Sequence, residues 1–282
     1  MALSSVAPGA AAQGAAALRA RHTALREALA ASPFQRPLVL ESVQVGDALK
    51  GEVHAVVAQP FAVVSHALQG VDHWCDILIL HLNVKRCRAI ARPAGSVLSV
   101  AIGRKHEQPP DEAFQVELAY RLLARSADFL EVRLDAPQGP LGTRDYRIVA
   151  QAVALEPGVS FIRLSYSYDY GLAARLAMKA YLATLGRDKV GFSIVGRQTD
   201  GSPVYVGDVR GAVERNTMRY YLAIEAYLDA CRLPPAEQPL HRLKAWFDAV
   251  ERYPRQLHEL SREEYLSMKR REAAQAAAPA GC

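Results

Sequence analysis

The feature that most constrains the fold is a run of strand-like segments between residues 85 and 169, joined by short turns. The separators, such as "RPAGS", "RSAD" and "EPG", are rich in residues that favour turns. Short connections between successive strands require neighbouring strands to run antiparallel. The sequence therefore predicts an antiparallel meander with strands at 85–91, 97–105, 114–123, 129–135, 146–155 and 160–169.

One further strand and two short helices are expected before the meander. Partial alternation of apolar and polar residues predicts a strand at 47–58. Pro60 then suits the entry of a helix at 61–68, and 71–80 forms a second short helix or a helix-to-strand transition. Upstream, residues 1–14 are expected to be disordered, and 15–46 to hold a surface helix at 15–31 and a lead-in.

A helix is predicted at 172–185, directly after the last strand. Wound at 100° per residue, it shows one stripe of small residues that includes Leu172, Leu176 and Ala180, and a second stripe of larger apolar residues. A surface helix normally shows a single apolar stripe. We therefore expect this helix to be covered on two sides, by the sheet and by the C-terminal helices.

The C-terminal third is predicted to be mainly helical. Residues 196–211 form a loop with a short hairpin at Asp200-Gly201, followed by helices at 209–228, 240–251 and 262–271 and a disordered tail at 273–282. Arg215 and Arg219 share a face of the helix at 209–228, which we interpret as a basic edge on an exposed helix surface.

The order of these elements resembles the helix-grip fold of the START-like, polyketide-cyclase and Bet v 1-like superfamily. The resemblance covers residues 47–195 and rests on two stretches, "VVAQPFAVVSHAL" and "DYRIVAQAVALEPGVSFIRLSYSYDYG". It implies an α+β fold, in which a curved antiparallel sheet of about seven strands wraps around a long helix. The helices within 196–272 are additional to the family pattern and suggest a bacterial member with a C-terminal helical extension.

The resemblance also implies an apolar cavity between the concave face of the sheet and the long helix. Members of the superfamily bind lipids, sterols or polyketides, and a few catalyse cyclisation. Strand alternation places Tyr166 and Tyr168 on the face toward the cavity. Hydroxyl groups there could orient the polar end of a ligand. A filled core without a cavity is the alternative. The candidate ligand-binding residues are Tyr120, Tyr146, Tyr166, Tyr168, Leu172, Leu176 and Ala180.

No catalytic or cofactor-binding motif is present in the sequence. His66, His73 and His81 are seven and eight residues apart, which is not the spacing of a helical metal pair. The stretch "DHWCD" (72–76) brings together potential ligands and a thiol, but loop and capping roles explain it equally well. We expect no catalytic residue, no metal and no cofactor.

Charge and hydropathy exclude two classes of protein. The net charge is +5, and there is no run of five or more Lys or Arg residues, so we expect no nucleic-acid partner. No stretch approaches the ~20 apolar residues that span a membrane.

Cys75 and Cys87 are twelve residues apart and would pair in an oxidising compartment. Two buried free thiols are the alternative.

Three functions follow from these observations. The first is binding or transport of a hydrophobic small molecule, with a membrane surface or a membrane protein as a further partner. The second is a cyclase or aromatase using cavity tyrosines or histidines, and the third is a partner-docking protein without a ligand. A carrier between two membranes and a disulfide both suit a bacterial periplasm, and the cytoplasm is the alternative.

Overall fold

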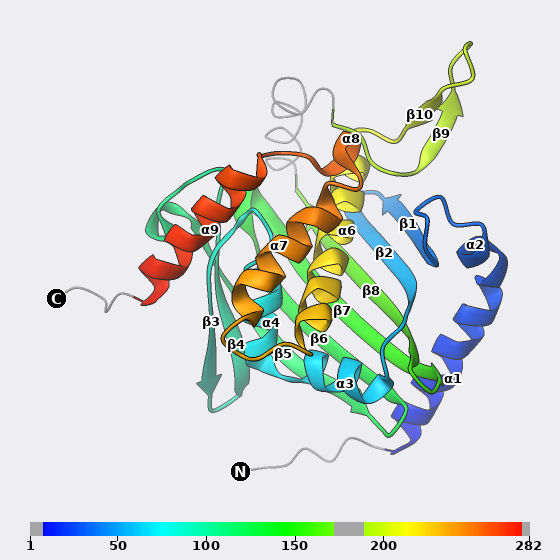
Figure 1. Cartoon of the computed structure of the whole chain (residues 1–282), viewed down its shortest axis with the longest axis horizontal. Helices are drawn as coiled ribbons and strands as arrows, with labels where there is room; N and C mark the ends of the chain where they lie inside the picture. The colour runs from blue at the N-terminus through cyan, green and yellow to red at the C-terminus, as the bar shows by residue number, and fades with distance from the viewer. Residues whose placement is uncertain (1–7, 172–188, 278–282) are drawn as a thin grey trace.

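The computed structural model describes residues 8–171 and 189–277, and its centre is an eight-stranded antiparallel sheet in the order β1-β2-β8-β7-β6-β5-β4-β3 (Figure 1). Its strands are β1 (Leu38–Val45), β2 (Ala48–Val57), β3 (Val84–Arg92), β4 (Gly95–Ile102), β5 (Phe114–Arg125), β6 (Phe129–Gln138), β7 (Thr143–Glu156) and β8 (Val159–Tyr170). A separate hairpin pairs β9 (Ile194–Arg197) with β10 (Pro203–Tyr205).

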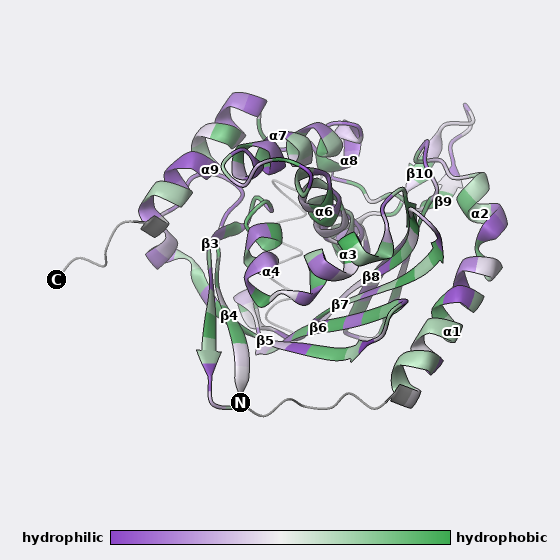
Figure 2. Cartoon of the chain, turned by 60° about the horizontal axis from the view of Figure 1, so that its bottom comes forward, coloured by the Kyte–Doolittle hydropathy of each residue, from purple (hydrophilic) through white to green (hydrophobic). Residues whose placement is uncertain are grey.

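The helices lie on both faces of this sheet. They are α1 (Pro8–Ala24), α2 (Arg26–Ala30), α3 (Phe61–Gln69), α4 (Val71–Leu78), α6 (Asp208–Ala230), α7 (Gln238–Val250), α8 (Pro254–Leu257) and α9 (Arg262–Ala277). Figure 2 shows the sheet curving around α3, α4 and α6, with α1 on the outer side. We call the side that carries α6 the inner face and the side that carries α1 the outer face.

Strand β2 shows how the sequence sets these two faces. Its residues alternate, so that Leu49 and Val53 lie in the core beneath α6 while Glu52 and His54 lie on the opposite side. On the neighbouring strand, Phe161 belongs to the second core, beneath α1. Strands β2 and β8 are thus largely buried on both sides, beneath α6 on the inner face and beneath α1 on the outer face.

Helix α6 is the long helix around which the sheet curves. It packs against β1, β2 and β8 on one side and against α7 on another, and most of its side chains are buried. It lies close against the sheet at Gly51, where an added Cβ atom would lie 2.2 Å from Oγ1 of Thr217 and 3.4 Å from the carbonyl oxygen of Val213. Only a glycine permits that approach.

The predicted α+β class, with a curved antiparallel sheet and helices, is confirmed, with eight strands in place of about seven. The sequence placed the long helix at 172–185, outside the described residues, whereas the long helix described against the sheet is α6, which was expected to be an additional helix. The additional strand is β1, which the prediction treated as lead-in although "LVLESVQV" alternates. The short hairpin at Gly201 is confirmed, since β9 and β10 flank that turn. The division into a domain at 47–195 and an extension at 196–272 stays a prediction.

Three expectations were wrong. Residues 8–14 are helical and not disordered, because Ala11 and Ala15 bury their side chains against the sheet. Residues 273–277 continue α9, whose Glu272 is buried in an ion-pair network. Arg215 and Arg219 do not form an exposed basic edge, since they are only 2% and 1% exposed. In all three cases the helix or the burial depends on packing against distant parts of the chain, which the local sequence does not show.

The helix predicted at 172–185 lies outside the described residues, together with the candidate ligand-binding residues Leu172, Leu176 and Ala180.

Candidate functional site

A cavity of about 120 Å³ lies between the inner face of the sheet and the helices α4 and α6. Most of its wall is aliphatic, with one residue or more from α4, β3, β4, β5 and β7. Polar side chains come from the α4–β3 loop, β7, β8 and α6. The lining residues are Leu78, His81, Asn83, Val84, Val100, Ile102, Val116, Leu118, Pro140, Tyr146, Ile148, Tyr166, Asn216 and Tyr220.

Two residues of the α4–β3 loop give this cavity a polar end. His81 is 3% exposed, and its Nδ1 atom accepts a hydrogen bond from the backbone N–H of Asn83 at 3.1 Å. A neutral imidazole that accepts at Nδ1 carries its proton on Nε2. Asn83 donates from Nδ2 to the carbonyl oxygen of Gly103 at 3.1 Å, which leaves its Oδ1 atom as an acceptor. Among the residues that the structure describes, neither Nε2 of His81 nor Oδ1 of Asn83 has a hydrogen-bond partner, and both atoms are buried.

The environment of His81 keeps its imidazole neutral. Burial lowers its pKa well below the usual value, and the charges of Arg219, Lys269 and Lys105 lower it further, while the side-chain amide of Asn216, which lies near the ring, acts in the opposite sense. The ring stacks on Tyr220 with centroids 4.8 Å apart. His81 is therefore a fixed N–H donor at neutral pH and a poor proton acceptor.

Two of the predicted tyrosines line the cavity and two do not. Tyr146 and Tyr166 lie in its wall, with ring centroids 6.1 Å apart, and burial raises the pKa of both hydroxyls. Tyr168 stacks on Tyr146 at 5.2 Å and forms a second layer. The Tyr120 hydroxyl donates to the carbonyl oxygen of Gln69 at the end of α3, away from the cavity, and burial raises its pKa to about 12.

A disulfide between Cys75 and Cys87 closes the loop that supplies the polar end. Cys75 lies on α4 and Cys87 on β3, with Cα atoms 5.2 Å apart and a separation of 12 residues in sequence. His81 and Asn83 lie within this closed loop. Closing a loop by a covalent bond restricts the conformations it can reach, so the disulfide helps to hold both residues in place.

Helix α9 supports the same loop from the other side. The Lys269 ammonium donates to the carbonyl oxygens of His81 at 2.9 Å and of Val84 at 2.8 Å, and it pairs with Glu272 at 2.9 Å. Lys85 pairs with the other oxygen of Glu272 at 3.1 Å. These groups are almost fully buried, and burial lowers the pKa of Lys269 to about 8. The loop is thus fixed by covalent and ionic contacts.

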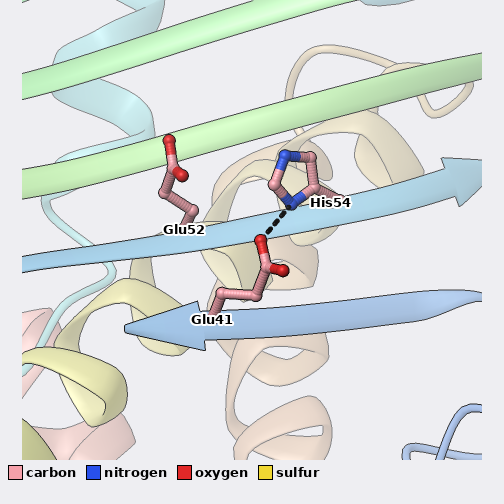
Figure 3. Close-up of side chains that lie close together, drawn as sticks. All are labelled: Glu41, Glu52 and His54. Carbon is pink, nitrogen blue, oxygen red and sulfur yellow. Dashed lines mark ion pairs between the residues drawn. The ribbon is translucent and has the colours of Figure 1, made fainter. Parts of the chain in front are cut away.

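A second group of side chains, Glu41, Glu52 and His54, lies on the outer face (Figure 3). One ligand atom from each lies within 4.8 Å of the other two, which satisfies a loose criterion for a metal site. His54 is 1% exposed, and its Nδ1 atom lies 3.7 Å from Oε2 of Glu41. Burial, followed by the charge of Arg21, lowers the pKa of His54 to about 4, so the ring is neutral and able to ligate.

The charges around this group argue against a cation there. Arg21 pairs with Glu41, and its Nε–H group donates a hydrogen bond to Nε2 of His54 at 3.4 Å. Arg163 donates to Glu52 at 2.9 Å, and Lys50 pairs with the same carboxylate at 3.0 Å. Three cations thus surround two carboxylates, and a divalent ion would have to displace them. We interpret the group as an anchor between α1, which carries Arg21, and the sheet.

The stretch 72–76 holds no nucleophile in this structure. Cys75 is bonded to Cys87, and Asp76 pairs with Arg242 at 2.7 Å. Nδ1 of His73 lies 3.1 Å from the carbonyl oxygen of Ala67. Arg163, on β8, lies on the outer face, where it donates to Glu52.

Sequence reasoning missed His81, Asn83, Asn216 and Tyr220. The signal for His81 is a polar residue that directly follows the apolar run at 77–80, at the end of a short helix. Asn216 and Tyr220 are one helical turn apart on α6, which was interpreted as an exposed helix. Their position could not be found without knowing that α6 packs on the sheet.

No family model and no curated protein matches the chain. No described helix has the length and apolarity to cross a membrane. Solved structures with a similar fold do exist. The chain is similar to norcoclaurine synthase from Thalictrum flavum at 14% identity and a TM-score of 0.34, over 53% of this chain and 82% of that one.

Two further structures show the same likeness. A START superfamily protein from Mycobacterium smegmatis matches at 14% identity and a TM-score of 0.32, over 53% of this chain and 92% of that one. Ara h 8.0201 matches at 14% identity and a TM-score of 0.35, over 65% of this chain and 99% of that one. All three TM-scores lie below 0.5.

Proposed function

We propose that this protein binds a small, mostly apolar molecule in the cavity between the inner face and α6. The observation that carries the proposal is the cavity itself. Its wall combines aliphatic side chains with a few polar groups at defined positions, which is the composition of small-molecule sites in general. The loop that carries two of these polar groups is fixed by a disulfide and by Lys269, so the site is formed before a ligand arrives.

The volume limits the ligand to a compact molecule. Pockets for drug-sized ligands are typically about 300–1,000 Å³. The cavity here is about 120 Å³, close to the roughly 150 Å³ of an engineered apolar cavity that binds benzene. A fatty acid or a sterol does not fit this volume. We therefore expect a hydrophobic ligand of about the size of a single six-membered ring.

The two alternative functions have less support. A cyclase or aromatase needs a proton acceptor, whereas His81 presents an N–H group and no Asp or Glu lines the cavity among the described residues. A docking protein needs a broad exposed apolar patch on the C-terminal helices. Within residues 209–270, Leu240 is the one large apolar side chain that is exposed.

The disulfide supports a location in an oxidising compartment, such as a bacterial periplasm, because cytosolic thiols are usually kept reduced. A carrier role between membranes, with a membrane surface or a membrane protein as partner, remains the expectation from the sequence.

The proposal is tested by titrating the protein with toluene, phenol and palmitate while recording methyl NMR spectra of its Val and Leu residues. We expect the single-ring probes to shift the methyl signals of Val100 and Leu118, and palmitate to leave them unchanged. Val100→Phe fills the cavity and should abolish these shifts. Val97→Phe adds the same bulk on the same strand at a residue outside the cavity lining, so it should retain them.

Val116→Ile is a milder filling variant if Val100→Phe does not fold, and it should weaken binding of both rings. Equal binding by wild-type protein and the filling variants would overturn the proposal. So would the absence of any shift with every probe.

A further inference from the structure

We propose that the ligand of this cavity carries a hydroxyl group, as in a phenol or a compact alcohol, and that His81 and Asn83 hold that hydroxyl between them. The inference rests on the proposed function and names the class of molecule. It is carried by two buried polar atoms of lining residues, one donor and one acceptor, that have no partner among the described residues.

The donor is the Nε2–H group of His81. The backbone N–H of Asn83 occupies Nδ1, so the proton of the neutral ring is on Nε2. Lys269 holds the His81 carbonyl oxygen, and the ring stacks on Tyr220, so neither the backbone nor the ring is free to turn away from the cavity wall. A buried N–H group without a partner is unfavourable, and an acceptor on a ligand would remove that cost.

The acceptor is Oδ1 of Asn83. Its orientation follows from the hydrogen bond that Nδ2 donates to the carbonyl oxygen of Gly103, because exchanging the two amide atoms would set two oxygens against each other. The side chain therefore cannot serve as a second donor toward the cavity. A ligand that fits both residues must accept from one and donate to the other.

A hydroxyl group is the smallest group that does both. A carboxylate only accepts, so it would leave Oδ1 of Asn83 beside a negative oxygen. An ammonium only donates, and the buried charges of Arg219, Lys269 and Lys105 near His81 would repel it. A primary amide has both functions, but an aromatic amide exceeds the size that about 120 Å³ admits. A hydrocarbon would leave both atoms unpaired.

The test compares phenol with toluene, which has the same number of heavy atoms and nearly the same shape but no hydroxyl. We expect wild-type protein to bind phenol at least tenfold more tightly than toluene, by competition NMR on one sample. His81→Phe keeps a ring to stack on Tyr220 but removes the donor, and Asn83→Leu removes the acceptor. In each variant the phenol preference should fall to threefold or less while toluene affinity stays within threefold of wild type.

His54→Phe is the matched control, since it makes the same substitution at the buried histidine of the outer face and should leave the phenol preference unchanged. Equal binding of phenol and toluene by wild-type protein would overturn this inference and leave the proposed function standing. An unchanged preference in both His81→Phe and Asn83→Leu would overturn it too, because the pair would then hold only water. Binding of neither ring would overturn the proposed function itself.

Discussion

The two faces of the sheet each bury one histidine, and the surroundings of these histidines differ. On the outer face, His54 lies beside Glu41 and Glu52 (Figure 3). Arg21 pairs with Glu41, and Arg163 pairs with Glu52. On the inner face, His81 lies at the end of a cavity whose wall is mostly aliphatic. Burial keeps both imidazoles neutral, yet only His81 is placed where a small molecule could reach it.

The difference teaches that a buried titratable group does not by itself mark a binding site. His54, with its lowered pKa and two neighbouring carboxylates, has the features usually sought in a metal or catalytic centre. Its cationic neighbours already compensate those carboxylates, and the result is an anchor for α1. His81 lacks a neighbouring carboxylate, but the space beside it is free. Available volume therefore separates the two roles better than pKa does.

The largest expected effect comes from the disulfide beneath the cavity. Replacing Cys75 and Cys87 together by Ser should lower the free energy of unfolding by about 3 kcal/mol. Without the bond, the unfolded chain regains the conformational freedom of the loop that the bond closes. Urea denaturation measures this. Cys231→Ser is the control and should change stability by less than about 0.5 kcal/mol, since Cys231 forms no disulfide. A loss below 1 kcal/mol in the double variant would contradict the role given to the bond.

Two glycines allow a direct comparison of packing on the two faces. Gly51→Ala should cost about 2–3 kcal/mol, because the new Cβ atom meets Thr217 and a backbone oxygen of α6. Gly14→Ala, on α1, should cost less than about 1 kcal/mol. There the Cβ atom meets the Phe129 ring, and the higher helix propensity of Ala offsets the strain. Urea midpoints of the two variants test this, and an equal cost at both positions would contradict the closer fit of α6.

The buried histidines predict the dependence of stability on pH. The pKa of His54 is about 4 in the folded protein and about 6.5 when unfolded, so the unfolded state binds the proton first as the pH falls. Its contribution is complete above pH 6.5 and is lost between about pH 6.5 and 4. From pH 7 to 5 the loss should be about 2 kcal/mol for His54, and His81 should add to it in the same direction.

His54→Gln should remove its part of this pH dependence in a series of urea denaturations, leaving the part due to His81. The charged groups that face His54, namely Arg21, Glu41, Glu52 and Arg163, remain in the variant. A pH dependence unchanged by the substitution would show that His54 is accessible to protons in the folded state.

Much of this architecture follows from local sequence. The six meander strands, α3, α4 and the alternation that places Tyr166 inward and Arg163 outward are set by periodicity and turn residues. Strand β1 and the first turns of α1 were missed, because the pairing that stabilises them is with segments distant in the chain. The polar end of the cavity was missed for the same reason, since His81 and Tyr220 meet only through the packing of α6.

The smallest expected effect separates the two layers of tyrosines. Tyr166→Phe should weaken phenol binding by a few-fold, because Tyr166 lines the cavity. Tyr168→Phe should leave phenol binding unchanged, because Tyr168 lies behind Tyr146. Each substitution should change stability by about 1 kcal/mol or less. Calorimetric titration of phenol into both variants measures these affinities. Equally weakened phenol binding in the two variants would place both hydroxyls in the site.

The most direct test of the central claim is a nitrogen-15 NMR spectrum of the histidine rings with and without phenol at pH 7. The account predicts that both rings are neutral, that the Nε2–H signal of His81 shifts on addition of phenol, and that the signals of His54 do not move. Unchanged His81 signals at saturating phenol, or a shift of His54 alone, would contradict the assignment of the inner cavity as the binding site.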